Sequence, residues 1–191
     1  MKQENTVKYI LRLTFTLLAI CAAVAAILAG VNAITAPIIA ETKAAKTQQA
    51  IAAVVPGAED VAEISFTDAS GLVSKVYAVS TGNTAAISGY AVEVAPSGFG
   101  GAITMMVGVS LDGKVTGISI ISHAETPGLG AVAAAGTDKG VAFREQFAGL
   151  VSGITIGNGA NQIDALAGAT ISSQAIVNGV NAALDCINHM G

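Results

Sequence analysis

Three hydroxyl side chains stand where a turn of small residues runs into the last helical stretch of the sequence: Thr170, Ser172 and Ser173. From Ile176 onward, apolar residues recur at the spacing of one helix face. Hydroxyls at a helix start can cap its free backbone N–H groups, which is an ordinary structural role. The first turn also lacks Asp and Glu, so the same N–H groups are available to a phosphate. From the residues alone, both interpretations stand.

A second polar group follows a run of strand-like sequence. It reads His123-Ala-Glu125-Thr126-Pro127-Gly128-Leu129-Gly130. The proline and two glycines indicate a shaped loop rather than regular structure. Composition alone allows a simple strand exit with a solvated His and Glu. The run Ser97-Gly98-Phe99-Gly100-Gly101 is a weaker candidate of the same kind, since a flexible turn before a strand has this composition too.

Several other functions have no support in the residues. His123 and Glu125 would offer two metal ligands where a structural zinc site needs four, so no metal site is expected. The string from Gly128 to Ala133 fits G-x-G-x-x-A but follows a proline and lacks the later acidic residue of a dinucleotide site. No nucleophile elbow for hydrolysis appears. The net charge of −4 and the scattered Lys and Arg argue against nucleic acid.

The N-terminal part predicts a membrane anchor. The chain is 52% hydrophobic with a mean hydropathy of +0.65, and the run 13–34 is almost uncharged and long enough to cross a bilayer. We expect a transmembrane helix over 13–36, stopped by Pro37. A cleaved signal peptide, a lipoprotein signal ending at Cys21 and a buried core helix are alternatives. The apolar run is too long for the first, Ile20 is too large for the second, and the run is too uniformly apolar for the third.

Charge and composition organise the flanking segments. Lys2, Lys8 and Arg12 precede the span and Lys43 and Lys46 follow it, so the N-terminus, 1–12, is expected in the cytoplasm and the bulk of the chain outside. The segment 37–60 is expected to be a helical stalk or linker, broken at Pro56-Gly57. The remaining residues, 61–191, form the expected domain. Cys21 and Cys186 lie far apart, and no disulfide between them is expected.

The domain has the pattern of an α+β fold. Strand-like runs occupy 61–66, 72–80, 87–95, 103–111 and 114–121. Asp112-Gly113 between the last two predicts a two-residue type I′ hairpin. Strands without helices between them predict an antiparallel sheet. A helix over 138–147 and the terminal helix would then cover one face of that sheet.

The sequence from Asp164 to Ser172 resembles a flavinylation motif. Asp164, Gly168, Ala169, Thr170 and Ser172 match the motif of the FMN-binding domain found in the G subunit of Rnf electron-transport complexes and in the C subunit of sodium-pumping NADH:quinone reductases. Ala167 stands where that family usually has Ser or Thr. The run from His123 to Gly130 is similar to a second hallmark of the same family, and the run 97–101 loosely resembles a third.

This resemblance implies a function. Thr170 would carry covalent FMN through a phosphoester made by a flavin transferase, with Asp164, Gly168, Ala169 and Ser172 shaping the phosphate turn. The residues Glu125, Thr126, Gly128 and Leu129 would frame the flavin. The chain would relay electrons beside other subunits in a bacterial or archaeal cell membrane, within a complex that couples ferredoxin:NAD oxidoreduction to ion translocation. The quinone-reductase counterpart and an anchored, non-redox binding or assembly domain without flavin remain alternatives.

Overall fold

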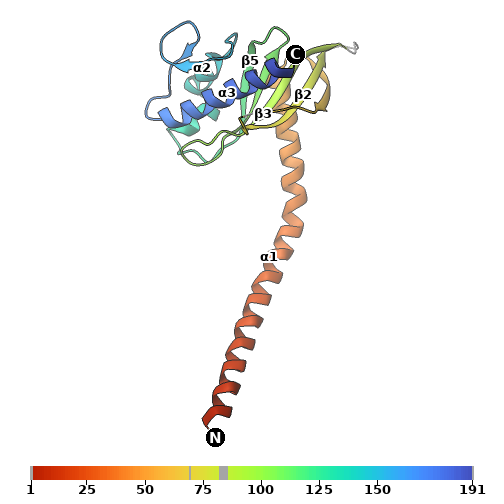
Figure 1. Cartoon of the computed structure of the whole chain (residues 1–191), viewed down its shortest axis with the longest axis vertical. Coiled ribbons are helices and arrows are strands. Elements are labelled where there is room, and N and C mark those ends of the chain that lie inside the picture. Colours follow the sequence, from red (N-terminus) through yellow and green to blue (C-terminus); the bar gives the residue numbers. More distant parts are fainter. Residues whose placement is uncertain (1, 69, 82–85, 191) are drawn as a thin grey trace. The chain divides into compact units, whose positions relative to one another are not determined.

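The computed structural model of the chain describes residues 2–68, 70–81 and 86–190 (Figure 1). The chain divides into two compact units, Met1–Ala45 and Lys46–Gly191. The first unit is a stretch of one helix. The second contains the end of that helix, a five-stranded sheet and two further α-helices.

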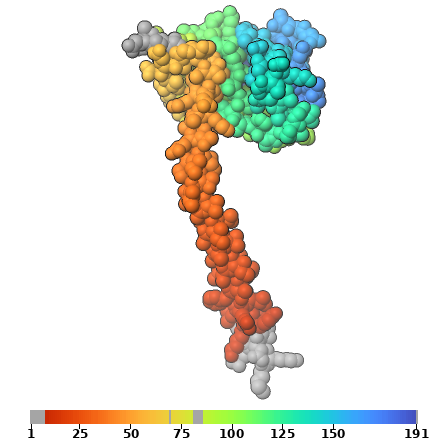
Figure 2. All heavy atoms as spheres, turned by 180° about the vertical axis from the view of Figure 1, so that it is seen from behind, coloured from red at the N-terminus to blue at the C-terminus, as the bar shows by residue number. Residues whose placement is uncertain are grey.

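The first helix, α1, runs from Lys2 to Val54 with Pro37 inside it, so the prediction that Pro37 stops the helix is wrong. Proline removes one N–H donor, but long apolar helices in membranes tolerate that loss. Among the described residues, α1 is the one helix long and apolar enough to cross a membrane. In the first unit its large apolar side chains, from Tyr9 to Ile39, are exposed (Figure 2).

Five strands form one antiparallel sheet, and each pairs with its neighbour in sequence, in the order β1-β2-β3-β4-β5. Their bounds are β1 Ala58–Ile64, β2 Val73–Thr81, β3 Ile87–Val94, β4 Thr104–Ser110 and β5 Val115–Ser122. Every strand predicted from the sequence is present, displaced by a few residues at most. The α+β class with an antiparallel sheet is therefore confirmed.

The turn between β4 and β5 differs from the predicted type I′ hairpin. That turn needs a positive φ at both central residues, whereas in the described part of the chain only glycines, among them Gly113 at 73°, have one. The Gly113 N–H donates to the Ser110 carbonyl at 3.0 Å, and the Ser110 N–H to the Lys114 carbonyl at 2.8 Å. The connection is thus a three-residue loop, a type I turn followed by a glycine bulge.

Helices cover both faces of the sheet. Met105 on β4 packs in one core cluster with the terminal helix α3, Thr170–Met190, whereas its neighbour Met106 packs with Ile51 and Val54 of α1. Successive strand residues point to opposite faces. The helix α3 therefore covers one face (Figure 1), and the last turns of α1, which the sequence analysis assigned to a linker, cover the other.

Two short elements follow β5. They are the 3-10 helix η1, Gly130–Ala134, and the helix α2, Asp138–Glu145, which Thr137 caps by accepting the Gly140 N–H. The rings of Phe143 and Phe147 are buried on the α3 side of the sheet and meet edge to face at 5.6 Å. A further pair of two-residue strands, β6 Thr155–Ile156 and β7 Gln162–Ile163, lies between α2 and α3. Neither η1 nor this pair was predicted, because such short elements carry no periodic signal.

Candidate functional site

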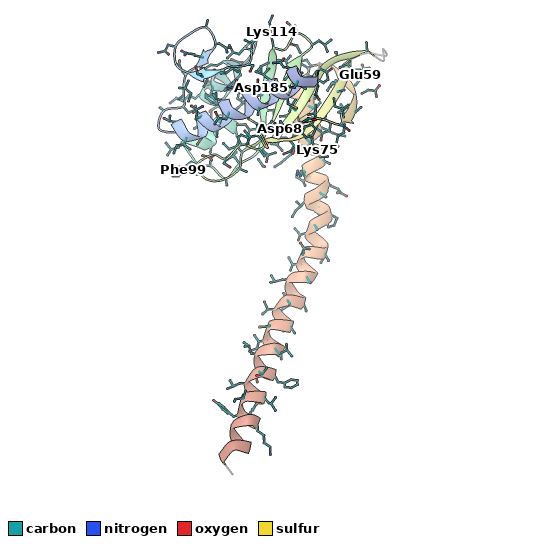
Figure 3. The ribbon with its side chains drawn as sticks, in the orientation of Figure 1. Glu59, Asp68, Lys75, Phe99, Lys114 and Asp185 are labelled. Atoms are coloured by element: carbon teal, nitrogen blue, oxygen red, sulfur yellow. The ribbon has the colours of Figure 1, made fainter. Side chains whose placement is uncertain are left out.

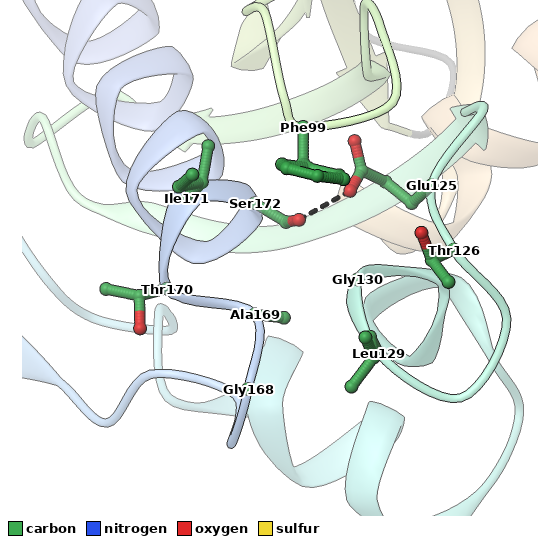
Figure 4. Close-up of a pocket in the computed structure, with 10 residues that line it drawn as sticks. All are labelled: Phe99, Glu125, Thr126, Leu129, Gly130, Gly168, Ala169, Thr170, Ile171 and Ser172. Atoms are coloured by element: carbon green, nitrogen blue, oxygen red, sulfur yellow. Dashed lines mark hydrogen bonds between the residues drawn. The ribbon is translucent and has the colours of Figure 1, made fainter.

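A pocket of about 350 Å³ opens at the N-terminal end of α3 (Figure 4). Three segments meet there: the loop before β4, the loop after β5 and the turn into α3. The residues that line it are Phe99, Glu125, Thr126, Leu129, Gly130, Gly168, Ala169, Thr170, Ile171 and Ser172. The structure thus brings together the three motif segments that the sequence analysis singled out.

Thr170 is the first residue of α3, and its side chain is exposed at the pocket. The Ala169 carbonyl accepts the first helical hydrogen bond, from the Ser173 N–H at 2.9 Å, so Ala169 occupies the cap position. The Ser173 hydroxyl donates to that same carbonyl and accepts from the Leu166 N–H, both at 3.0 Å. The turn is therefore held by Ser173, while Thr170 lines the pocket and is exposed.

Gly168 sets the turn before Thr170. Its φ of +73° lies in the left-handed region that favours glycine. A Cβ at this position would also stand 3.1 Å from Cδ2 of Leu129. The glycine therefore lets the turn into α3 approach the loop after β5 closely, and Leu129 packs against the backbone at that point.

Glu125 is the one ionisable side chain among the residues that line the pocket, and only 6% of it is exposed. Its Oε2 accepts from the Ser172 hydroxyl at 2.5 Å and its Oε1 from the Gly100 N–H at 2.9 Å. Buried carboxylates need such partners because desolvation is costly. The hydroxyl of Ser172, expected to shape a phosphate turn, is directed to Glu125 in the structure (Figure 4).

Two of the predicted site residues do not line the pocket. Gly128 lies in the tight turn closed by the Leu129 N–H and the Thr126 carbonyl at 3.2 Å. Asp164 is exposed, and the Gln146 side chain holds its backbone: the Asp164 N–H donates to Oε1 at 2.7 Å, and Nε2 donates to the Asp164 carbonyl at 3.4 Å. Asp164 therefore belongs to the approach to the turn rather than to the pocket wall.

Three lining residues were missing from the predicted site: Phe99, Gly130 and Ile171. Phe99 is 70% exposed on a loop pinned by the bridge between Ser97 and Ala102, and it projects at the margin of the domain (Figure 3). The glycines on both sides of Phe99 could have indicated a binding loop from the sequence, but ordinary turns share that composition. Ile171 lies before the apolar face of α3 begins, so helical periodicity does not select it.

The pocket suits a ligand that combines a planar apolar ring with a negative group. Phe99, Leu129 and Ile171 supply apolar surface, and the volume falls within the 300–1,000 Å³ of small-molecule sites. None of the lining residues is Lys or Arg, and the first turn of α3 has no acidic residue. Because no cationic side chain is among the described residues that line the pocket, the stabilisation of a phosphate at Thr170 would come from the free N–H groups and the dipole of α3. No acidic residue in the first turn would repel it.

Comparison with known proteins defines the class of this domain. The profile of the FMN-binding domain family matches residues 98–185, a range that contains every residue lining the pocket. The second unit therefore contains an FMN-binding domain.

Whole-chain comparisons then define the family. The chain is 33% identical over 201 residues to the G subunit of the Na(+)-translocating ferredoxin:NAD(+) oxidoreductase complex of Acetobacterium woodii, covering 96% of this chain and 94% of that protein. It is 31% identical over 185 residues to the G subunit of the ion-translocating oxidoreductase complex of Methanosarcina acetivorans, covering 95% of this chain and 96% of that protein. The proton-translocating counterpart from Clostridium ljungdahlii is 39% identical over 109 residues, 57% of each chain. The chain belongs to the family of G subunits of ion-translocating, Rnf-type oxidoreductase complexes.

Proposed function

We propose that this chain is a membrane-anchored flavoprotein subunit that carries FMN covalently on Thr170. It would relay electrons within an Rnf-type complex that couples ferredoxin:NAD oxidoreduction to ion translocation. The names of two relatives give that coupled reaction for the complexes to which those proteins belong. The observation that carries the proposal is the exposed Thr170 at the start of α3, which lines the same pocket as the apolar residues Leu129 and Ile171. A flavin transferase would form the phosphoester.

The residues present fit this cofactor. The N-terminus of α3 would hold the phosphate, Leu129 and Ile171 would contact the ring, and the Thr126 hydroxyl would face its polar edge. Bound FMN supplies the electron-accepting ring system, and the protein supplies position and electrostatics. A covalent bond removes the need for a deep pocket with high equilibrium affinity. The exposed walls of this pocket are consistent with a cofactor that exchanges electrons with neighbouring carriers.

The anchor and its orientation belong to the same proposal. The apolar span 13–36 within α1 would cross the bilayer once, with 1–12 in the cytoplasm and the FMN-binding domain outside. Close to the span, three basic residues precede it and two, Lys43 and Lys46, follow it. Alkaline phosphatase fused at the C-terminal end of α3 should be active, and the same enzyme fused before Lys2 should be inactive. The reverse pattern would contradict this orientation.

Two other functions compete with the relay. The C subunit of a sodium-translocating quinone reductase would share the domain, but the relatives described above are all G subunits. Purification from native membranes separates these two by the proteins that co-purify. A non-redox anchored domain is favoured only by Ala167, which replaces the usual Ser or Thr of the motif.

Covalent attachment is tested by intact mass and in-gel flavin fluorescence of the denatured protein, produced together with an active flavin transferase. The wild type should gain the mass of FMN less one water, and Thr170→Val should not. Thr155→Val is the control, because Thr155 is also an exposed threonine but does not line the pocket and should leave attachment intact. Unmodified wild-type protein would reject the relay function and favour the non-redox domain.

A further inference from the structure

We propose that Glu125 is a positioning residue: its one carboxylate ties the three segments around the pocket together and fixes the walls of the flavin site. The part of this inference that concerns flavin rests on the proposed function. The part that concerns the coupling of the segments involves the polypeptide alone and is testable without flavin.

The three segments meet at the Glu125 side chain. Glu125 belongs to the loop after β5, and its Oε2 accepts the Ser172 hydroxyl from the first turn of α3 at 2.5 Å. Its Oε1 accepts the Gly100 N–H from the loop before β4 at 2.9 Å. These partners lie 47 and 25 residues away in sequence. One side chain thus joins parts of the chain that the sequence keeps far apart.

Two glycines make room for the carboxylate. A Cβ at Gly98 would collide with Oε1, and a Cβ at Gly130 would collide with Oε2 and with the Ser172 hydroxyl oxygen. Gly98 precedes Phe99 in the loop before β4, and Gly130 follows Leu129. The backbone of both loops therefore closes directly onto Glu125, and any side chain at either glycine would push it away.

Each apolar wall of the pocket is adjacent in sequence to a group that meets this carboxylate. Phe99 lies between Gly98 and Gly100, and Leu129 precedes Gly130. Ile171 lies between Thr170 and Ser172. A displacement of Glu125 would therefore move all three walls together with Thr170, the proposed FMN acceptor.

Because Glu125 and Ser172 are buried, the two hydrogen bonds that the Glu125 carboxylate accepts depend on each other. Glu125 is 6% exposed and Ser172 is 2% exposed. Among the described residues, the ion pairs are Lys75–Glu63 and Lys114–Asp112, so the Glu125 carboxylate relies on a backbone N–H and a hydroxyl for its stabilisation. In such a buried network the loss of one donor weakens the rest. Removing the Ser172 hydroxyl should therefore weaken the hydrogen bond between Glu125 and the Gly100 N–H and so loosen the loop before β4. Ser172 itself makes no hydrogen bond to the described residues of that loop.

The test compares Ser172→Ala with Ser173→Ala in full-length, flavin-free Thr170→Val protein in detergent. Both serines are buried in the first turn of α3, but Ser173 bonds only the Ala169 carbonyl and the Leu166 N–H. Amide hydrogen exchange at Gly100 should become about fivefold faster in Ser172→Ala, the effect of one typical hydrogen bond. It should not change in Ser173→Ala. Unchanged exchange at Gly100 in Ser172→Ala, or equal acceleration in both variants, would overturn the proposal.

The flavin-dependent readout uses the same two substitutions with Thr170 intact. Iodide should quench the fluorescence of the attached flavin more strongly in Ser172→Ala than in wild type or Ser173→Ala, because displaced walls expose the ring. Equal quenching in all three proteins would refute the claim that Glu125 positions the walls. A wild type without flavin would reject the proposed function, and the Gly100 exchange would then decide the proposal alone.

Discussion

The Thr116 hydroxyl on β5 donates to the carbonyl of Val54, the last residue of α1, at 2.5 Å. Val54 is 1% exposed and packs in one cluster with Val79 and Met106 of the sheet. The end of α1 is therefore a structural part of the FMN-binding domain. It covers the sheet face opposite α3.

Truncation should reveal this role. Removal of residues 1–45 should leave the domain stable, whereas removal of 1–57 should lower its free energy of unfolding by roughly 3–5 kcal/mol, because several buried apolar side chains are lost. Urea denaturation of the two proteins measures the difference. Equal stability of both truncated proteins would show that the end of α1 contributes nothing to the domain.

Gly168→Ala should affect both stability and flavin attachment. Gly168 has a φ of +73° and approaches Leu129, whereas Gly149 has a φ of +81° with nothing within 4 Å of its added Cβ. Both alanine substitutions should cost about 1–2 kcal/mol, the strain of a left-handed alanine. Only Gly168→Ala should also reduce the fraction of protein that carries FMN, measured by intact mass. Equal flavin content in the two variants would contradict the role given to Gly168.

Asp68 should make the stability depend on pH (Figure 3). Partial burial acts to raise the pKa of this carboxyl, but hydrogen bonds from the Val73 N–H and from the Ser70 hydroxyl and N–H outweigh burial and lower it. A lowered folded-state pKa stabilises the fold above the unfolded pKa of about 3.9, and this stabilisation is lost as pH falls through the folded pKa.

Asp68→Asn should therefore lower the free energy of unfolding at pH 7 by roughly 1 kcal/mol, the net value of a hydrogen bond of this kind. The gap between wild type and variant should narrow as pH falls below about 4, because the wild-type carboxyl becomes protonated whereas the variant has no titratable group at this position. Urea denaturation at pH 7 and pH 3 measures both gaps. A gap of the same size at the two pH values would disprove the effect.

Cys186 should be unreactive in the folded protein. Burial raises the pKa of its thiol, and the nearby charge of Asp68 acts in the same direction. Because the thiolate is the nucleophile, iodoacetamide should alkylate Cys186 slowly at pH 8 and rapidly once urea unfolds the domain. Mass spectrometry in a Cys21→Ser background follows the reaction. Rapid alkylation without urea would show that the thiol is accessible.

The local parts of the fold were predictable from sequence, as the hairpin of β4 and β5 shows. Strand-like runs rich in β-branched residues on either side of Asp112-Gly113 indicated two paired strands. The turn type was wrong because Asp112 keeps a negative φ and the loop takes a third residue. The end of α1 was also misjudged, although Ala50, Ile51 and Val54 form a small buried apolar face within this Ala-, Lys- and Gln-rich segment.

The pocket was predictable only in part, because its geometry depends on contacts distant in sequence. Thr170, Leu129 and Glu125 lay in recognisable motifs, and the structure brings them to one pocket. The bond between Ser172 and Glu125 could not be foreseen, since a hydroxyl in the first turn of a helix has several possible partners. The long helix past Pro37 escaped prediction because helix-stop rules describe chains in water rather than apolar spans.

The order of the strands has a consequence for how the protein is made. Each strand pairs only with the next one along the chain, so the sheet closes short loops and can assemble in step with synthesis. The pocket is complete only when α3 has been added, because Thr170 and Ser172 belong to that helix. If the flavin transferase acts on the assembled pocket, the proposed attachment of FMN follows assembly of the whole domain. A flavin on Thr170 would in that case mark a protein whose FMN-binding domain has finished folding.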